Sequence, residues 1–261
     1  EVRGILRFVE DDIGIVEGTA GADLIDGTYL GDPDGDRVDA NDGQGVSGTV
    51  GDADYIMAGA GNDTVTAGAG NDIIYGGTGD DKLAGGTGDD ELTGGAGNDV
   101  FIGVVDTAQD FYNGGAGIDL IDYSNGSIAL NVETYNGFYS GLENGWSFQY
   151  NGQLQTYNSI EGIIGTQFDD RLNNYYNQPV YFDGQGGNDV IYSNHSNDTL
   201  LGGLGNDYIY AYNGNDSIIA GAGNDSVYGD NNNDTIFGGL GDDYLDGGEQ
   251  DDSVFGESGN D

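Results

Sequence analysis

The stretch IIAGAGNDSVYGDNNNDTIFGGLGDDYL, residues 218–245, returns to an aspartate every nine positions, at Asp225, Asp234 and Asp243. Glycine-rich runs separate these aspartates, and one aliphatic residue follows each of them after two positions. Carboxylates held at so regular a spacing repel one another unless a counter-charge lies between them. The regular spacing therefore indicates that the carboxylates act together as a set.

The composition excludes several classes of partner. Of the 261 residues, 47 are acidic and five are basic, which gives a formal net charge of −42. Nucleic acids and anionic membranes are therefore poor partners, whereas cations are natural ones. The 52 glycines make folding costly in backbone entropy, so the chain needs an additional source of free energy to fold. The 18 tyrosines and nine phenylalanines nevertheless argue against a disordered linker.

Features that the sequence lacks narrow the class further. It has no cysteine, which excludes disulfides and thiolate metal sites. No apolar run approaches the length of a transmembrane helix, and the first residues, EVRGILRFVEDDIGIVEG, lack the apolar region of a signal peptide. Because the chain begins at Glu1 and ends inside a repeat at Asp261, we expect it to be a piece of a longer protein.

A nine-residue unit repeats along most of the chain. When aspartate is numbered position 6 of the unit, position 8 is aliphatic or Phe throughout the two regular blocks. Two blocks keep this spacing without a gap, and a looser spacing adds further aspartates between them. The position-6 aspartates are Asp54, Asp63, Asp72, Asp81, Asp90 and Asp99 in the first block, Asp110, Asp119 and Asp170 at the looser spacing, and Asp189, Asp198, Asp207, Asp216, Asp225, Asp234, Asp243, Asp252 and Asp261 in the second block. Repeats of this kind predict a stacked, one-dimensional array.

The length of the unit predicts its structure. Nine residues are too few for a helix and a turn, but they fit a glycine-rich turn followed by a three-residue strand whose middle residue points inward. Two units then make one coil of 18 residues, with odd and even units in two parallel sheets and successive rungs about 4.8 Å apart. The sequence therefore predicts an all-β fold, a parallel β-roll or β-solenoid.

Position-6 aspartates that are 18 residues apart lie one rung apart on the same edge of such a roll. Two charges about 5 Å apart repel by roughly 1 to 3 kcal/mol, and a divalent cation between them reverses the sign. The turns offer oxygen ligands only, which favours calcium over zinc. Roughly fourteen ions could bind between the pairs 54/72, 63/81, 72/90, 81/99, 90/110, 99/119, 170/189, 189/207, 198/216, 207/225, 216/234, 225/243, 234/252 and 243/261.

The units GGTGDDKLA (residues 76–84) and GGLGNDYIY (residues 202–210) resemble the RTX (repeat-in-toxin) nonapeptide GGxGxDxUx, a hemolysin-type repeat that covers roughly two-thirds of the chain. The resemblance implies a calcium-binding β-roll in which each ion lies between two turns. One turn supplies the carbonyls of positions 2 and 4 with its aspartate, and the turn two units later supplies the carbonyls of positions 1 and 3 with its own. The ligands implied in this way include Gly203, Gly205 and Asp207 with Ala220, Ala222 and Asp225, and Gly221, Gly223 and Asp225 with Gly238, Leu240 and Asp243. The remaining turn residues implied are Gly59, Gly61, Gly68, Gly70, Gly76, Gly77, Thr78, Gly79, Gly85, Gly86, Thr87, Gly88, Gly94, Ala96, Gly202, Leu204, Gly239 and Gly241.

Some units depart from the motif at position 4, where it has glycine. Phe168, Ser196, Asn232 and Gln250 occupy that position in four turns. Residues other than glycine tolerate a positive φ poorly, Asn best among them, so the sites at Phe168 and Gln250 fit the motif least well. The resemblance also implies secretion by a type I system and folding on external calcium, although the terminal secretion signal expected for that route is not visible.

The chain divides into four parts by its repeat pattern. Residues 1–50 form an N-terminal cap with one repeat around Asp23 and an acidic loop, residues 51–122 the first block, residues 123–164 a β-rich extension, and residues 165–261 the second block. Within the acidic loop, DPDGD resembles the start of an EF-hand, but Gly43 stands where its last acidic ligand belongs, so we favour a solvated loop over a further cation site.

The extension lacks the aspartate spacing but keeps an alternation of apolar residues. Ile128, Leu130 and Val132 alternate, as do the aromatic residues of 146–150, which predicts an inserted hairpin of longer strands that extends one sheet. The aromatic side chains could bind sugar, but packing against the roll is the simpler expectation. His195 is the only histidine, and without a paired nucleophile or second ligand it forms no catalytic constellation.

Position 9 of the second block should face out of the roll. On one sheet this position is Leu201, Ile219, Phe237 and Phe255, whereas the other sheet carries tyrosines. The apolar stack is either scatter tolerated on the surface, a surface covered by sequence downstream, or a packing surface for another chain or domain.

Taken together, the residues favour a secreted bacterial calcium-binding β-roll with a structural or assembly role in a surface layer, filament, adhesin or matrix. It would be extracellular or attached to the cell surface, and would self-associate or bind another surface protein through the Leu201/Ile219/Phe237/Phe255 face. The alternative is a calcium-stabilised accessory or carbohydrate-binding module of a secreted enzyme whose catalytic domain lies elsewhere. We expect no intrinsic catalytic activity from these residues.

Overall fold

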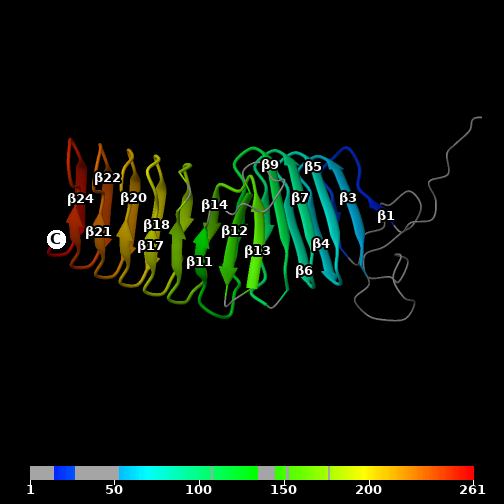
Figure 1. Cartoon of the computed structure of the whole chain (residues 1–261), viewed down its shortest axis with the longest axis horizontal. Helices are drawn as coiled ribbons and strands as arrows, with labels where there is room; N and C mark the ends of the chain where they lie inside the picture. Colours follow the sequence, from blue (N-terminus) through cyan, green and yellow to red (C-terminus); the bar gives the residue numbers. More distant parts are fainter. Residues whose placement is uncertain (1–14, 27–52, 107, 135–144, 151–152, 176) are drawn as a thin grey trace, which may run out of the picture.

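The computed structural model describes residues 15–26, 53–106, 108–134, 145–150, 153–175 and 177–261. All regular structure in these ranges is β, and the coils stack along one axis into an elongated roll (Figure 1). No helix in the described ranges is long and apolar enough to cross a membrane. The predicted all-β parallel roll is confirmed.

One face of the roll is a continuous parallel sheet, the long sheet, which runs through the whole described stack. Its rungs are 18 residues apart within the repeat blocks, as in the pairing of Ile218 with Ile236. The strands of the long sheet are, in spatial order, β2 (Leu24–Ile25), β4 (Thr64–Ala69), β6 (Lys82–Thr87), β8 (Val100–Ile102), β10 (Leu120–Asp122), β14 (Gly162–Ile164), β16 (Tyr181–Asp183), β18 (Thr199–Leu204), β20 (Ser217–Ala222), β22 (Thr235–Leu240) and β24 (Ser253–Ser258).

The opposite face, expected to be the second of the two parallel sheets, consists of two separate sheets. The N-terminal sheet has the order β1 (Ile15–Glu17), β3 (Tyr55–Ala60), β5 (Ile73–Thr78), β7 (Glu91–Ala96), β9 (Phe111–Ala116), β13 (Gln153–Asn158) and β12 (Gly145–Tyr150). The C-terminal sheet has the order β11 (Asn131–Thr134), β15 (Arg171–Asn174), β17 (Val190–Tyr192), β19 (Tyr208–Tyr210), β21 (Ser226–Tyr228) and β23 (Tyr244–Asp246).

The inserted hairpin explains the break between these two sheets. Strands β12 and β13 pair antiparallel, and β13 continues the N-terminal sheet in parallel beside β9. The outer strand β12 runs in the opposite direction, so it ends the parallel ladder. The prediction of a hairpin that extends one sheet is confirmed. Its expected partner strand around Ile128–Val132 is wrong, because β11 instead begins the C-terminal sheet beside β15.

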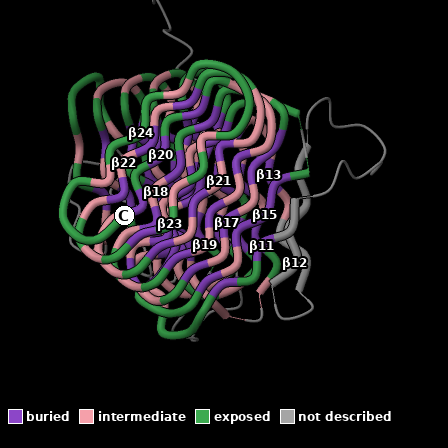
Figure 2. Tube along the Cα trace, turned by 90° about the vertical axis from the view of Figure 1, so that its left-hand side faces the viewer, coloured by how far each residue is buried: buried purple, intermediate pink, exposed green. Residues whose placement is uncertain are grey.

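The core is a column of position-8 side chains between the two faces, seen as the buried band in the end-on view of Figure 2. Ile74, Leu83, Ile209 and Ile236 are fully buried there. Several strands are six residues long rather than three, as β5 is, because positions 2 and 3 of the next turn also pair with the neighbouring rung. Packing therefore extends from the strands into the turns that carry the aspartates.

Candidate metal centres

The turns bring every predicted aspartate pair together. In each of the fourteen pairs the backbone N–H of one aspartate donates to Oδ1 of the aspartate in the next rung, over 2.7–3.1 Å. Asp207 donates to Asp225 over 2.8 Å, and Asp225 donates to Asp243 over 2.9 Å. The 18-residue pairing predicted from the sequence is therefore confirmed in space.

The second carboxylate oxygen has a different environment. In many of these aspartates Oδ2 is buried and has no hydrogen-bond partner within the described part of the chain. Such an oxygen loses its hydration without compensation, which is costly for a charged group. The aspartates with such an oxygen are Asp63, Asp81, Asp99, Asp119, Asp189, Asp207, Asp216, Asp225, Asp234 and Asp243.

In several turns this oxygen lies near a backbone carbonyl of the next rung. A methyl group placed on Gly238 would lie 2.6 Å from Oδ2 of Asp243 and 2.8 Å from the carbonyl oxygen of Gly256, in the next rung. At Gly202 the same position lies 2.5 Å from Oδ2 of Asp207 and in contact with the carbonyl of Ala220. A carboxylate oxygen of one turn and a carbonyl oxygen of the next rung therefore converge on the same glycine.

The glycines at positions 2 and 4 supply further oxygens. Gly221 and Gly223 have φ of +121° and +140°, a region that favours glycine. A side chain at Gly239 or Gly241 would collide with the carbonyl oxygen of Gly221 or Gly223, respectively, so both carbonyls point from one rung toward the next. This is the direction that the resemblance requires for ligands at positions 2 and 4.

Among the described residues, no three carboxylate, imidazole or thiolate side chains form a metal-binding group. Each pair of turns instead offers two carboxylates and backbone carbonyls, all of them hard oxygen donors. This set fits calcium, which takes six to eight oxygen ligands in flexible geometry, and it does not fit zinc. The observation that decides the fit is the buried Oδ2 that no group in the described part of the chain satisfies.

Burial raises the pKa of these carboxyls. The pKa of Asp189 and of Asp216 rises to about 8, because burial disfavours the charged form more than a backbone hydrogen bond favours it, and neighbouring aspartates add repulsion. The pKa of Asp81 and of Asp207 rises to about 6 for the same reasons. Without a cation the stack is therefore electrostatically unfavourable at neutral pH, and a bound cation has to displace protons.

Two further carboxylate pairs, which the spacing did not predict, continue the row of aspartate pairs. The N–H of Asp23 donates to Oδ1 of Asp63 over 2.7 Å, and the N–H of Asp119 donates to Glu161 Oε2 over 2.8 Å. The turn between β13 and β14 has only three residues, Ser159–Glu161, and the longer glutamate side chain stands where other turns carry aspartate. Sequence spacing missed Glu161 because 42 residues separate it from Asp119. The only feature of the sequence that could have indicated Glu161 is its position directly before the apolar strand β14.

Three predicted site aspartates have an Oδ2 that accepts a hydrogen bond. That of Asp110 accepts from the Tyr112 hydroxyl over 3.0 Å, and those of Asp170 and Asp198 accept from their own turns. Oδ2 of Asp170 accepts from the N–H of Thr166 over 2.6 Å, and its Oδ1 accepts from the Thr166 hydroxyl over 2.9 Å. Oδ2 of Asp198 accepts from the N–H of Asn194 over 3.3 Å. These two turns have internal donors where the regular turns have unsatisfied oxygens, so their need for a cation is smaller.

The substitutions at position 4 behave in two ways. Asn232 and Gln250 adopt φ of +84° and +85° and so keep the turn of the motif despite their side chains. Phe168 and Ser196 are not among the described residues with positive φ, and their turns are the two with internal donors. The turn at Phe168 therefore departs from the motif, whereas Gln250 retains the motif conformation.

The predicted acidic loop of residues 27–50 lies outside the described residues, and so do the side chains of residues 146–150. His195 is exposed in a turn, where its Nδ1 lies 2.7 Å from Nδ2 of Asn213. The terminal rungs are the most open, and Asp261 is exposed whereas Asp225 is 2% exposed.

Stacked parallel coils, with paired buried carboxylates and carbonyls in every regular turn, define the class of calcium-binding β-rolls. The family model of the RTX calcium-binding nonapeptide repeat matches residues 49–83, 75–104, 181–209, 196–227, 210–245 and 228–261, together just over half of the chain. The chain belongs to this family of RTX calcium-binding repeat proteins. Comparison with curated proteins finds no match.

Proposed function

We propose that this calcium-binding β-roll is a secreted bacterial protein that folds when it meets extracellular calcium and then serves as a structural element. The observation that supports it is the row of buried aspartates with an unsatisfied Oδ2, whose pKa burial raises. Such a stack is unfavourable where calcium is scarce and becomes stable where calcium is abundant. Bound calcium supplies the positive charge that the carboxylates lack.

The structural role rests on an apolar ladder on the outer face of the long sheet. Leu201, Ile219, Phe237 and Phe255 are paired in register on successive rungs. The rings of Phe237 and Phe255 stack with their centroids 4.9 Å apart and an interplanar angle of 12°. Ile219 is 45% exposed and Phe255 is 48% exposed. We propose that a second copy of the chain covers this ladder, in a surface layer, filament, adhesin or matrix.

The ladder can support association but does not define it alone. Complete burial of such a side chain is worth roughly 1.5–3 kcal/mol, and these side chains are already partly covered. Calcium contributes by aligning the rungs and by reducing the net charge of −42 that keeps like chains apart. Self-association should therefore require calcium.

Light scattering at millimolar calcium tests this proposal. The double variant Phe237→Ser, Phe255→Ser should fold with calcium as the parent does but should lose the higher-order species. The matched control is Leu204→Ser, Leu240→Ser, because these two leucines are more than 60% exposed and lie at the ends of β18 and β22, outside the ladder. Only their backbone carbonyls are implied as calcium ligands, and the substitutions keep those. Assembly of the ladder variant to the extent of the parent, or a parent that stays monomeric, contradicts the proposal.

A further inference from the structure

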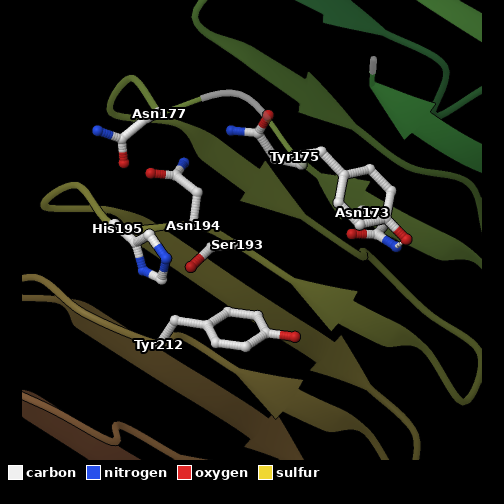
Figure 3. Close-up of a pocket in the computed structure, with 8 residues that line it drawn as sticks. Asn173, Tyr175, Asn177, Ser193, Asn194, His195 and Tyr212 are labelled. Carbon is white, nitrogen blue, oxygen red and sulfur yellow. Dashed lines mark hydrogen bonds between the residues drawn. The ribbon is translucent and has the colours of Figure 1, made fainter. Parts of the chain in front are cut away.

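A cavity of about 170 Å³ lies where the row of calcium turns is interrupted (Figure 3). Three successive turns on the edge that leads into the long sheet contribute to it. In the first of them Val180 stands where other turns carry the position-6 aspartate, and its N–H donates to Asp198 over 2.9 Å. In the second the Asp198 carboxylate accepts from Asn194. The cavity thus lies beside turns that depart from the motif.

The wall of this cavity is made of neutral hydrogen-bonding groups. Asn173, Asn174, Asn177 and Asn194 contribute amides, and Ser193 contributes a hydroxyl. Asn194 is 7% exposed and its Nδ2 donates to the carbonyl of Gln178 over 2.8 Å, which fixes the orientation of the amide. Its Oδ1 is buried and has no hydrogen-bond partner within the described chain. A buried acceptor of this kind, in the wall of a cavity, favours a ligand that donates a hydrogen bond.

His195 completes the polar wall of the cavity. Nδ2 of Asn231 donates to Oδ1 of Asn213, so Asn213 turns its Nδ2 donor toward Nδ1 of His195, 2.7 Å away. Nδ1 therefore accepts this bond, and the proton of the neutral imidazole lies on Nε2. The ring lines the cavity and, in this tautomer, carries one donor, the N–H of Nε2.

Aromatic rings supply the apolar part of the wall. Tyr175 and Tyr212 line the cavity, and the Tyr212 ring lies edge-on to His195 with centroids 6.1 Å apart. Tyr212 occupies position 2 of its turn with φ of +71°, a region that favours glycine and that Gln185, Asp230 and Glu257 also adopt at position 2 of their turns. The chain thus holds a tyrosine beside the cavity at a position where glycine is the residue of low strain.

From these groups we infer that the cavity binds one ring of a neutral sugar. Amide, hydroxyl and imidazole groups suit hydroxyl groups that both donate and accept, and tyrosine rings suit the C–H faces of a sugar. Anions are disfavoured by a net charge of −42, and cations find no carboxylate among the lining residues. The volume admits a single sugar ring rather than a larger ligand. The site requires the calcium-loaded fold of the proposed function but not self-association.

The test uses the single histidine as a reporter in NMR titrations of the calcium-loaded chain. The probes are glucose, galactose, mannose and N-acetylglucosamine, with glucuronate as the charged comparison and dextran as the polymer. We expect a neutral sugar to shift the His195 ring signals with a dissociation constant on the order of 1–10 mM. A shift with free sugar assigns the site to any sugar ring, and a shift with dextran alone assigns it to a unit within a polymer.

Two variants and one control locate the binding. Tyr212→Gly introduces the glycine that the motif has at this position, so the turn should still form, and affinity should fall at least about tenfold. Asn194→Ala should have a similar effect and removes the unsatisfied acceptor. Asp230→Gly is the control, because Asp230 occupies the same turn position with φ of +78° one rung further on, outside the cavity. No shift with any neutral probe, stronger binding of glucuronate, or parental affinity in Tyr212→Gly overturns the inference. Calcium-induced folding, followed separately by circular dichroism, distinguishes this result from a failure of the calcium-dependent fold.

Discussion

Replacing Asp225 by alanine should destabilise the calcium-loaded roll more than replacing Asp261. Asp225 is 2% exposed, its Oδ1 accepts from Asp207, and its N–H donates to Asp243. It therefore belongs to two successive pairs of turns. Asp261 is exposed and belongs to one pair, with Asp243.

The difference between the two variants follows from the number of ions each aspartate serves. At free calcium 100 times the dissociation constant, one bound ion stabilises the folded state by about 2.7 kcal/mol. Asp225→Ala removes a ligand from two sites and so should lose about 5 kcal/mol, whereas Asp261→Ala should lose about half of that. Asp225→Ala also leaves the buried N–H of Asp207 without its acceptor, which costs about 1–3 kcal/mol more.

A calcium titration followed by circular dichroism measures this difference. The calcium concentration at the midpoint of folding should be several-fold higher for Asp225→Ala than for Asp261→Ala. Asp225→Asn separates charge from hydrogen bonding, because the amide oxygen still accepts from Asp207 while the ion loses a charged ligand; its midpoint should lie between those of the parent and Asp225→Ala. Equal midpoints for Asp225→Ala and Asp261→Ala would refute ion binding between rungs.

Further predictions concern pH, turn conformation and catalysis. Burial raises the pKa of Asp189 and Asp216 to about 8, so calcium affinity should fall as the pH falls from about 8 to 5; calcium midpoints at pH 8.5 and pH 6 check this. Over the same pH range the calcium-free fold should gain stability, because its carboxyls become protonated; denaturation in EDTA checks this. Asn232→Gly should raise the free energy of unfolding by up to about 1 kcal/mol, because φ at Asn232 is +84°. Phe168→Gly should lower the free energy of unfolding, because Phe168 is not among the residues with positive φ. Urea denaturation in calcium compares the two variants. The described chain should show no hydrolysis of polysaccharide or peptide that a point mutation within it abolishes.

The repeat made the fold and most of the aspartate pairs predictable. A constant spacing of aspartate and of the buried residue two positions later fixes both the rung and the edge, so the pairing of Asp207 with Asp225 follows from arithmetic. The direction of each core side chain follows as well, because position 8 lies between two outward positions in a strand. Ile209 and Ile236 lie in the core as this pattern requires.

The interruptions of the repeat were not predictable in the same way. The split of one face depends on which strand pairs with β9, a long-range choice that local alternation does not contain. Glu161 was missed because a shortened turn replaces the motif, and the long glutamate side chain makes up the missing reach. The cavity was missed because it arises from side chains on three different turns, of which His195 and Tyr212 are 17 residues apart in the sequence.

Calcium-dependent folding is the central claim, and circular dichroism with chelation tests it most directly. The β signal should disappear when EDTA removes calcium and return when calcium is restored, and magnesium at the same concentration should not replace it, because magnesium demands a smaller and more regular site. A chelated chain that keeps the full β signal at neutral pH would contradict the account, since the buried aspartates would then be tolerated without a cation.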